Sequence, residues 1–187
     1  MIKNICISIL SATYLSIGSF STAESIATID EQSAFFATLQ SLCGSRFVGE
    51  MTFPTEGQDS FKDKELVADF KTCSNEEIRI PFSVGEDTSR TWIIRKTVDG
   101  IEFKHDHRHS DGTPDEVTNY GGNTLTVGEV LKQTFPADAF TKQLIPAAST
   151  NVWSMELSKD LSSLVYHLER HEKPRFTAVL YKKDPAL

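Results

Sequence analysis

Apolar and polar side chains alternate with a period of two along most of the chain after Gly44, and this alternation restricts the fold more than any other feature. Ile78, Ile80 and Phe82, for example, are separated by single residues that are charged or proline. Because successive side chains of a β-strand point to opposite faces, the pattern predicts strands with one buried face. Strands are predicted at 46–53, 65–71, 78–84, 91–98, 101–109, 151–157, 163–170 and 175–182, with a weaker candidate at 127–135.

Short turns separate the predicted strands. Asp99-Gly100 is a strong signal for a two-residue hairpin turn, and segments 120–123 and 173–174 also have the composition of turns. Eight to nine short antiparallel strands predict a mainly β fold, an up-and-down, lipocalin-like β-barrel. A two-sheet sandwich is the alternative. Residues 136–150 are expected to hold a short helix near 138–144, which either caps one mouth of the barrel or crosses its surface.

One amphipathic helix is predicted before the strands. Phe35, Leu39 and Leu42 recur at helical spacing, Asp30 is expected to cap the start, and Gly44 lies where a helix commonly ends. We therefore expect a single β-barrel domain at 24–187, with the N-terminal helix at 24–44 and the barrel at 45–184.

The first 23 residues have the composition of a signal peptide. Lys3 supplies a positive charge, residues 5–20 are mostly apolar, and small residues at 21–23 predict cleavage before Glu24. Several serines and threonines interrupt the apolar stretch, so it is a poor membrane span. The mature chain is expected to be exported, periplasmic or secreted, with no stable membrane anchor after cleavage.

Export determines how the cysteines are interpreted. Cys6 belongs to the predicted leader, which leaves Cys43 and Cys73 as one pair in an oxidising compartment. A disulfide between them would close a loop of about 30 residues and contribute roughly 3–4 kcal/mol. Two buried free thiols are the alternative. The chain has no C-x-x-C motif, which argues against a thioredoxin-like role.

The charge balance argues against a nucleic-acid partner. The chain carries 19 Lys and Arg against 26 Asp and Glu, a net charge of −7. Basic residues are scattered among acids instead of forming a stripe, so a phosphate-binding face is not expected. No sequence feature indicates an oligomeric state.

Three of the five histidines lie within the stretch KHDHRHSDG at 104–112. If Asp99-Gly100 is the turn of the hairpin, Val98 pairs with Ile101, and counting outward pairs Trp92 with His107. The same count places His109 opposite Arg90.

Directly opposed residues share one face of a sheet, and the face that carries Trp92 is the more apolar one. That face is therefore expected to line the barrel interior. Its predicted members are Trp92, Ile94, Val98, Ile101, Phe103, His105, His107 and His109, whereas Asp106 and Arg108 are expected to point outward.

An inward row of histidines has two interpretations. Neutral imidazoles at every second position can bind zinc or copper, so His105, His107 and His109 form a candidate metal site, completed by a carboxylate or another histidine. The other interpretation is a set of hydrogen-bonded polar residues at the wet mouth of a barrel. No H-E-x-x-H or C-x-x-C motif accompanies the histidines.

Several short motifs resemble a family of small exported bacterial proteins with a KHDHRH-x-DG motif. They are Ile80-Pro81-Phe82, Gly85-Glu86-Asp87, Ser89-Arg90-Thr91-Trp92, Lys104 to His109, Asp111-Gly112 and Tyr120-Gly121-Gly122. The resemblance implies a compact exported β domain and carries no activity. Gly44-Ser45-Arg46-Phe47 is more distantly similar to the first strand of lipocalin-like and nitrobindin-like barrels, which implies an interior pocket for a small apolar molecule or haem.

The sequence thus favours a non-catalytic protein that binds a small molecule inside a barrel. The predicted ligand-binding residues are Arg90, Trp92, Ile94, Phe103, His105 and His107. A zinc or copper protein or metal-dependent enzyme that uses the same histidines is one alternative. A filled barrel that acts through its surface as an interaction module is another.

Overall fold

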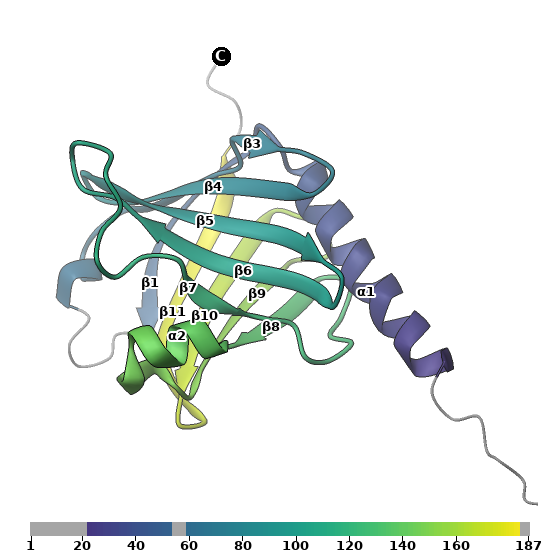
Figure 1. Cartoon of the computed structure of the whole chain (residues 1–187). Helices are drawn as coiled ribbons and strands as arrows, with labels where there is room; N and C mark the ends of the chain where they lie inside the picture. The colour runs from purple at the N-terminus through teal and green to yellow at the C-terminus, as the bar shows by residue number, and fades with distance from the viewer. Residues whose placement is uncertain (1–21, 54–58, 184–187) are drawn as a thin grey trace, which may run out of the picture.

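The computed structural model describes residues 22–53 and 59–183 of the 187-residue chain. Ten antiparallel strands follow one another around a nearly closed barrel, and a short eleventh strand, β3, pairs with β4 (Figure 1). The strands are β1 (Arg46–Phe53), β2 (Leu66–Asp69), β3 (Thr72–Cys73), β4 (Glu77–Val84), β5 (Asp87–Thr97), β6 (Gly100–His107), β7 (Tyr120–Asn123), β8 (Lys132–Pro136), β9 (Asn151–Leu157), β10 (Ser163–Arg170) and β11 (Lys173–Lys183). The helices are α1 (Thr22–Ser41) and α2 (Ala139–Leu144), with 3-10 turns η1 (Asp59–Phe61) and η2 (Pro146–Ala148).

The predicted mainly β, up-and-down barrel is confirmed, with ten strands around the barrel in place of eight to nine. The order is a meander: apart from β3, consecutive strands pair with each other from β1 to β7 and again from β8 to β11. The first and last strands, β1 and β11, also pair, from Arg46 with Lys183 to Phe53 with Thr177.

The seam between β7 and β8 is held by little backbone pairing. An isolated bridge joins Gly122 to Ala137, and the Asp138 N–H donates to the Gly121 carbonyl over 3.1 Å. A Cβ on Gly122 would lie 1.8 Å from the Pro136 carbonyl oxygen, so only glycine permits this approach. Segment 120–123, predicted as a turn, is therefore strand β7, and its glycines serve close backbone packing.

Helix α1 covers one end of the barrel (Figure 1). Phe35, Phe36, Leu39 and Leu42 are fully buried or nearly so, because this face of the helix packs into the barrel interior. The helix begins at Thr22, so the prediction that Asp30 caps its start is wrong. The predicted leader at 1–23 lies outside the described residues except for its last two.

A disulfide joins the end of α1 to strand β3. Cys43 and Cys73 are bonded, with their Cα atoms 6.2 Å apart, which confirms the predicted pair. The bond fixes the helix against the barrel at the end that α1 covers. Within the described part of the chain, no helix combines the length and the apolar composition that crossing a bilayer requires.

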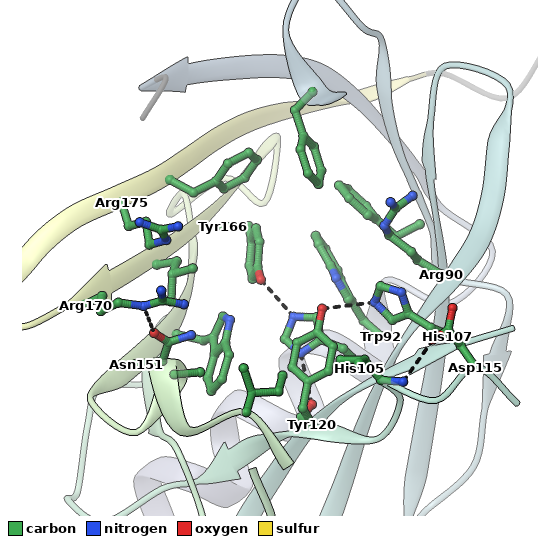
Figure 2. Close-up of a pocket in the computed structure, with 18 residues that line it drawn as sticks. Arg90, Trp92, His105, His107, Asp115, Tyr120, Asn151, Tyr166, Arg170 and Arg175 are labelled. Atoms are coloured by element: carbon green, nitrogen blue, oxygen red, sulfur yellow. Dashed lines mark hydrogen bonds between the residues drawn. The ribbon is translucent and has the colours of Figure 1, made fainter. Parts of the chain in front are cut away.

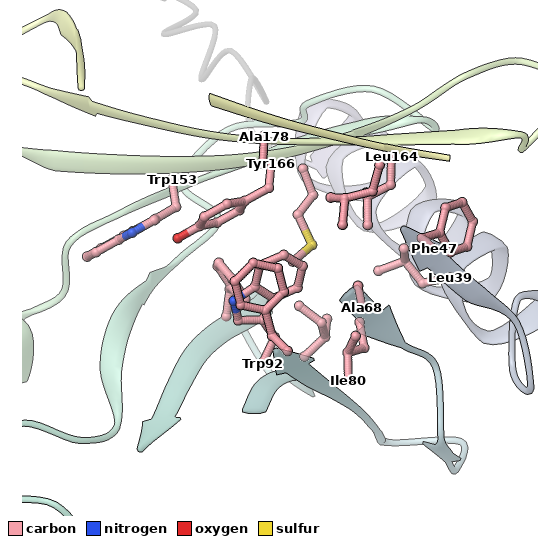
Figure 3. Packing of buried hydrophobic residues seen from close by; sticks show 14 of the residues in the cluster. Leu39, Phe47, Ala68, Ile80, Trp92, Trp153, Leu164, Tyr166 and Ala178 are labelled. Atoms are coloured by element: carbon pink, nitrogen blue, oxygen red, sulfur yellow. The ribbon is translucent and has the colours of Figure 1, made fainter. Parts of the chain in front are cut away.

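The barrel interior is packed from the α1 end to its middle (Figure 3). Leu39 belongs to α1 and Phe47 lies next to it, whereas Trp92, Trp153 and Tyr166 lie farther along the interior. Trp92 stacks on Phe82, with ring centroids 4.1 Å apart. Beyond this packed part, the interior opens toward the mouth opposite α1.

Candidate functional site

The β5–β6 hairpin places the predicted site residues, and its register differs from the predicted one. Thr97 pairs with Gly100, so Val98 and Asp99 form the turn, and Val98 is 96% exposed instead of interior. Gly100 lies in strand β6 with a φ of +129°, and a Cβ there would meet the side chains of Gln32 and Thr124 at 2.3 and 2.4 Å. Glycine at position 100 thus allows Gln32 of α1 and Thr124 to pack closely against the hairpin.

The turn lies one residue earlier than predicted, so each residue of β5 pairs with a residue of β6 two positions away from its predicted partner. Because side chains alternate with a period of two, the same residues still point into the barrel. Trp92 now pairs with His105, and Arg90 with His107 in place of His109. Trp92 and His105 therefore point into the barrel as predicted, and both are buried. Asp106 lies on the outer face but is also buried, because the segment after β6 covers it: Arg108 and Thr118 donate hydrogen bonds to it.

A cavity of about 330 Å³ opens at the barrel mouth opposite α1 (Figure 2). Four of the six predicted ligand-binding residues line it: Arg90, Trp92, His105 and His107. Ile94 and Phe103 do not, because they lie in the fully packed part of the interior. We call Trp92, Trp153, Tyr166 and Phe176 the aromatic floor of this pocket.

His105 is buried at the pocket wall with both ring nitrogens engaged. Its Nδ1 lies 3.2 Å from the Tyr120 carbonyl oxygen, and its Nε2 lies 2.8 Å from the Tyr166 hydroxyl. A carbonyl only accepts hydrogen bonds, so Nδ1 carries the hydrogen and the Nε2 lone pair accepts from Tyr166. Burial lowers the pKa of His105 to about 3, and the imidazole is neutral near pH 7.

A second histidine–tyrosine pair lies closer to solvent. The Nε2 atom of His107 is 3.0 Å from the Tyr120 hydroxyl, and the Tyr120 ring stacks on His105 with centroids 4.7 Å apart. Burial and the charge of Arg90 lower the pKa of His107, and burial raises the pKa of Tyr120 to about 12. Both tyrosine–histidine pairs are therefore uncharged near neutral pH.

The three histidines of the candidate metal site lie in three different environments. His109 lies beyond the end of β6, with its side chain 44% exposed. Among the described residues, the potential metal-binding atoms of His109, Asp115 and Glu116 all lie within 4.8 Å of one another. The other two histidines are not part of this cluster. A single zinc or copper site formed by His105, His107 and His109 gains no support from this geometry.

Neither pocket histidine has its Nε2 atom free to bind a haem iron. The Nε2 atom of each is hydrogen-bonded to a tyrosine hydroxyl. An iron, zinc or copper ion at either atom would have to displace Tyr166 or Tyr120. The arrangement is that of a polar network which fixes aromatic rings in place.

Two arginines on the opposite wall complete the pocket mouth (Figure 2). Arg170 ends β10, Arg175 lies near the start of β11, and both line the cavity. The Arg170 Nε donates to the Asn151 side-chain oxygen over 2.7 Å. Together with Arg90, we call these residues the mouth arginines.

Several pocket residues were not predicted as site residues. Trp153 and Tyr166 belong to the predicted strands at 151–157 and 163–170, and both are buried and also line the cavity. A tyrosine at an apolar position of a predicted strand indicates a polar contact inside the barrel, because its buried hydroxyl needs a hydrogen-bond partner. Here the partner is His105. Segment 136–150 contributes Ile145 and Ala148 to the pocket, which favours the first of its two predicted roles, a cap at one mouth, over a surface crossing.

The fold and pocket define an up-and-down β-barrel that is plugged by a helix at one end and hollow at the other. Comparison of the chain with models of known protein families, with curated proteins and with solved structures finds no match. The proposals that follow therefore depend on the geometry of this chain.

Proposed function

We propose that the protein is a non-catalytic binding protein that holds a small, planar and largely apolar molecule in its mouth pocket. The observation that carries this proposal is the 330 Å³ cavity, whose aromatic floor is bordered by a few fixed polar groups. Concave, mostly apolar pockets of this size are typical of small-molecule sites. We also propose that it acts after export, for which the sequence of 1–23 and the Cys43–Cys73 disulfide are the support.

The hydrogen bonding of His105 favours binding over acid–base catalysis. A general base needs a lone pair directed at its substrate. The His105 lone pair accepts from Tyr166, and the other nitrogen donates to the Tyr120 carbonyl. The imidazole thus holds the Tyr166 ring through its hydroxyl and stacks on the Tyr120 ring, and a planar ligand can stack against these aromatic rings.

A bulky side chain inside the pocket tests the proposal. Binding of neutral aromatic molecules such as indole, quinoline and 2-naphthamide is measured by titration calorimetry with the wild-type protein. We expect at least one to bind, and Ile145→Trp to weaken that binding by about tenfold or more by filling the cavity that Ile145 lines.

Val98→Trp is the matched control, because Val98 lies in the exposed β5–β6 turn and does not line the pocket. Its affinity should equal that of the wild type. Absence of binding for every member of the panel, or equal weakening by both tryptophans, would show that the pocket is not a binding site.

A further inference from the structure

Asn151 is a buried polar residue at the wall of the mouth pocket. It begins β9, is 4% exposed and lines the cavity. It lies directly opposite Arg170 of β10, and opposed residues of neighbouring strands share one face of a sheet. Burial of a side-chain amide is costly unless its oxygen and its nitrogen both have hydrogen-bond partners. The partners of Asn151 therefore indicate which polar group a ligand of this pocket carries.

Arg170 fixes the orientation of the Asn151 amide. The Arg170 Nε atom donates to the Asn151 side-chain oxygen over 2.7 Å (Figure 2). An arginine N–H can only donate, so it faces the oxygen of the amide and not the nitrogen. The NH2 group of Asn151 consequently points away from Arg170, toward the cavity that Asn151 lines.

No group within residues 22–53 and 59–183 accepts a hydrogen bond from this NH2 group. The bond to Arg170 is the one side-chain hydrogen bond of Asn151 in those ranges, and it engages the oxygen alone. Among the same residues, the only fully enclosed side-chain polar atom that lacks a partner is the Gln133 Oε1 atom. The Asn151 nitrogen is therefore not sealed inside the protein, and it is open to the cavity.

Other polar groups of the pocket are already engaged by the protein. His105 has both ring nitrogens bonded, and Arg90 is paired with Asp87. Asn151 differs from them because it presents an uncharged donor at a fixed place in the wall. Such a donor is satisfied by a hydrogen-bond acceptor on the molecule that fills the cavity.

We propose that the ligand of the pocket carries a carbonyl oxygen, which accepts a hydrogen bond from the Asn151 NH2 group while the planar apolar body lies on the aromatic floor. The inference rests on the proposed function and adds the polar group and the orientation of the ligand. A carbonyl oxygen accepts hydrogen bonds and carries no charge, so its burial needs no counter-ion. Because Arg170 already holds the amide, little side-chain entropy is lost on binding.

A ketone and its alcohol test the proposal with the intact protein. The ketone 2-acetylnaphthalene can only accept a hydrogen bond, whereas the alcohol 1-(2-naphthyl)ethanol can accept and donate. Both are titrated by calorimetry, and we expect the wild type to bind both, since each offers an acceptor to Asn151. In the infrared spectrum of the wild-type complex, the C=O stretch of the ketone, labelled with carbon-13 at the carbonyl, should lie at lower frequency than in cyclohexane.

Asn151→Asp removes the donor and keeps the shape of the side chain. One carboxylate oxygen can still accept from Arg170, and the other takes the place of the NH2 group. The ketone oxygen then faces an acceptor, whereas the alcohol can donate its hydroxyl hydrogen to it. We expect the variant to bind 2-acetylnaphthalene about tenfold more weakly than the wild type does, and to bind the alcohol within about threefold of wild type.

Asn75→Asp is the matched control. It makes the same change from amide to carboxylate at an exposed residue that does not line the pocket. Both affinities should stay within about twofold of wild type.

The outcomes separate the two proposals. If the wild type binds the ketone but its C=O stretch equals that in cyclohexane, the carbonyl inference is wrong and the binding function stands; this measurement decides even if Asn151→Asp does not fold. The same conclusion follows if a folded Asn151→Asp weakens ketone and alcohol equally, or if the wild type binds indole or quinoline but not the ketone. If none of these compounds binds, both the inference and the proposed function fail.

Discussion

At the scale of single residues, His105 shows how a polar side chain is accommodated in an apolar barrel. The ring is 5% exposed, and both nitrogens have partners, Tyr166 and the Tyr120 carbonyl. A buried imidazole with an unmatched nitrogen would cost a few kcal/mol, so these two bonds permit its burial. They also fix its tautomer, which keeps the Tyr166 hydroxyl bound at the pocket wall.

Protonation of His105 opposes folding, which gives a pH prediction. The folded-state pKa is about 3 and the unfolded value about 6.5, so the unfolded chain binds more protons between these values. The free energy of unfolding should therefore fall as the pH is lowered through this window. The contribution of His105 is on the order of 2 kcal/mol between pH 7 and pH 5.

Urea titrations at pH 7 and pH 5 measure this dependence in the wild type and in His105→Gln. Glutamine can hydrogen-bond to a tyrosine hydroxyl and does not titrate, so the variant should lose that part of the pH dependence. His107, whose pKa burial also lowers, contributes in the same direction and remains in both proteins. Identical pH dependence in the two proteins would show that His105 is not buried as a neutral ring.

The sequence was sufficient to group some pocket residues and not others. Trp92 and His105 could be placed on one face because the side-chain period of a strand is two and neighbouring strands share faces. Arg170 and Arg175 were not predicted, since their approach to Arg90 depends on how far the sheet curves before it closes. Curvature is a property of the whole sheet and leaves no local pattern.

At the scale of elements, alternation predicts strands well where one face is buried and the pairing is regular. The predicted strands at 151–157 and 163–170 have the same bounds as β9 and β10. Strand β7 was missed because two of its four residues are glycine, which carries no apolar signal. Its pairing is set by the proximity of β6 and of the segment after β8, and that proximity exists only in the folded barrel.

Gly122→Ala tests the glycine requirement of the seam. The added methyl would overlap the Pro136 carbonyl oxygen, which is backbone and cannot rotate away. We expect a loss of about 3 kcal/mol or more in the free energy of unfolding, measured by urea denaturation.

Gly112→Ala is the comparison for this change. Gly112 has a φ of +86°, but no atom lies within 4 Å of the place that an added methyl would take, so only backbone strain of about 1 kcal/mol is expected. If both substitutions lowered the free energy of unfolding equally, β7 and the segment after β8 could move apart at Gly122 without further cost, and the requirement for glycine there would be refuted.

At the scale of the whole molecule, the two ends of the barrel have different roles. One end is closed by α1, whose buried face completes the core, and the disulfide ties Cys43, just after the helix, to β3. The other end holds the pocket, with its aromatic floor and mouth arginines. Stability and binding should therefore respond to changes at different ends.

Removal of the disulfide tests this separation. Cys43→Ser with Cys73→Ser should lower the free energy of unfolding by roughly 3–4 kcal/mol, the value expected for a closed loop of about 30 residues. The affinity for the neutral aromatic ligand that the wild type binds should stay within about twofold, because neither cysteine lines the pocket. A large loss of affinity in a variant that remains folded would show that the two ends are coupled.

The pairing of β1 with β11 also constrains how the chain reaches its native state. Arg46 finds its partner in Lys183, so most of the polypeptide must be synthesised before the first strand can acquire its second neighbour. Such distant partners are associated with folding in milliseconds to seconds rather than microseconds. During that delay β1 has an unpaired edge, and a nascent chain would be vulnerable to aggregation until its last strand is available.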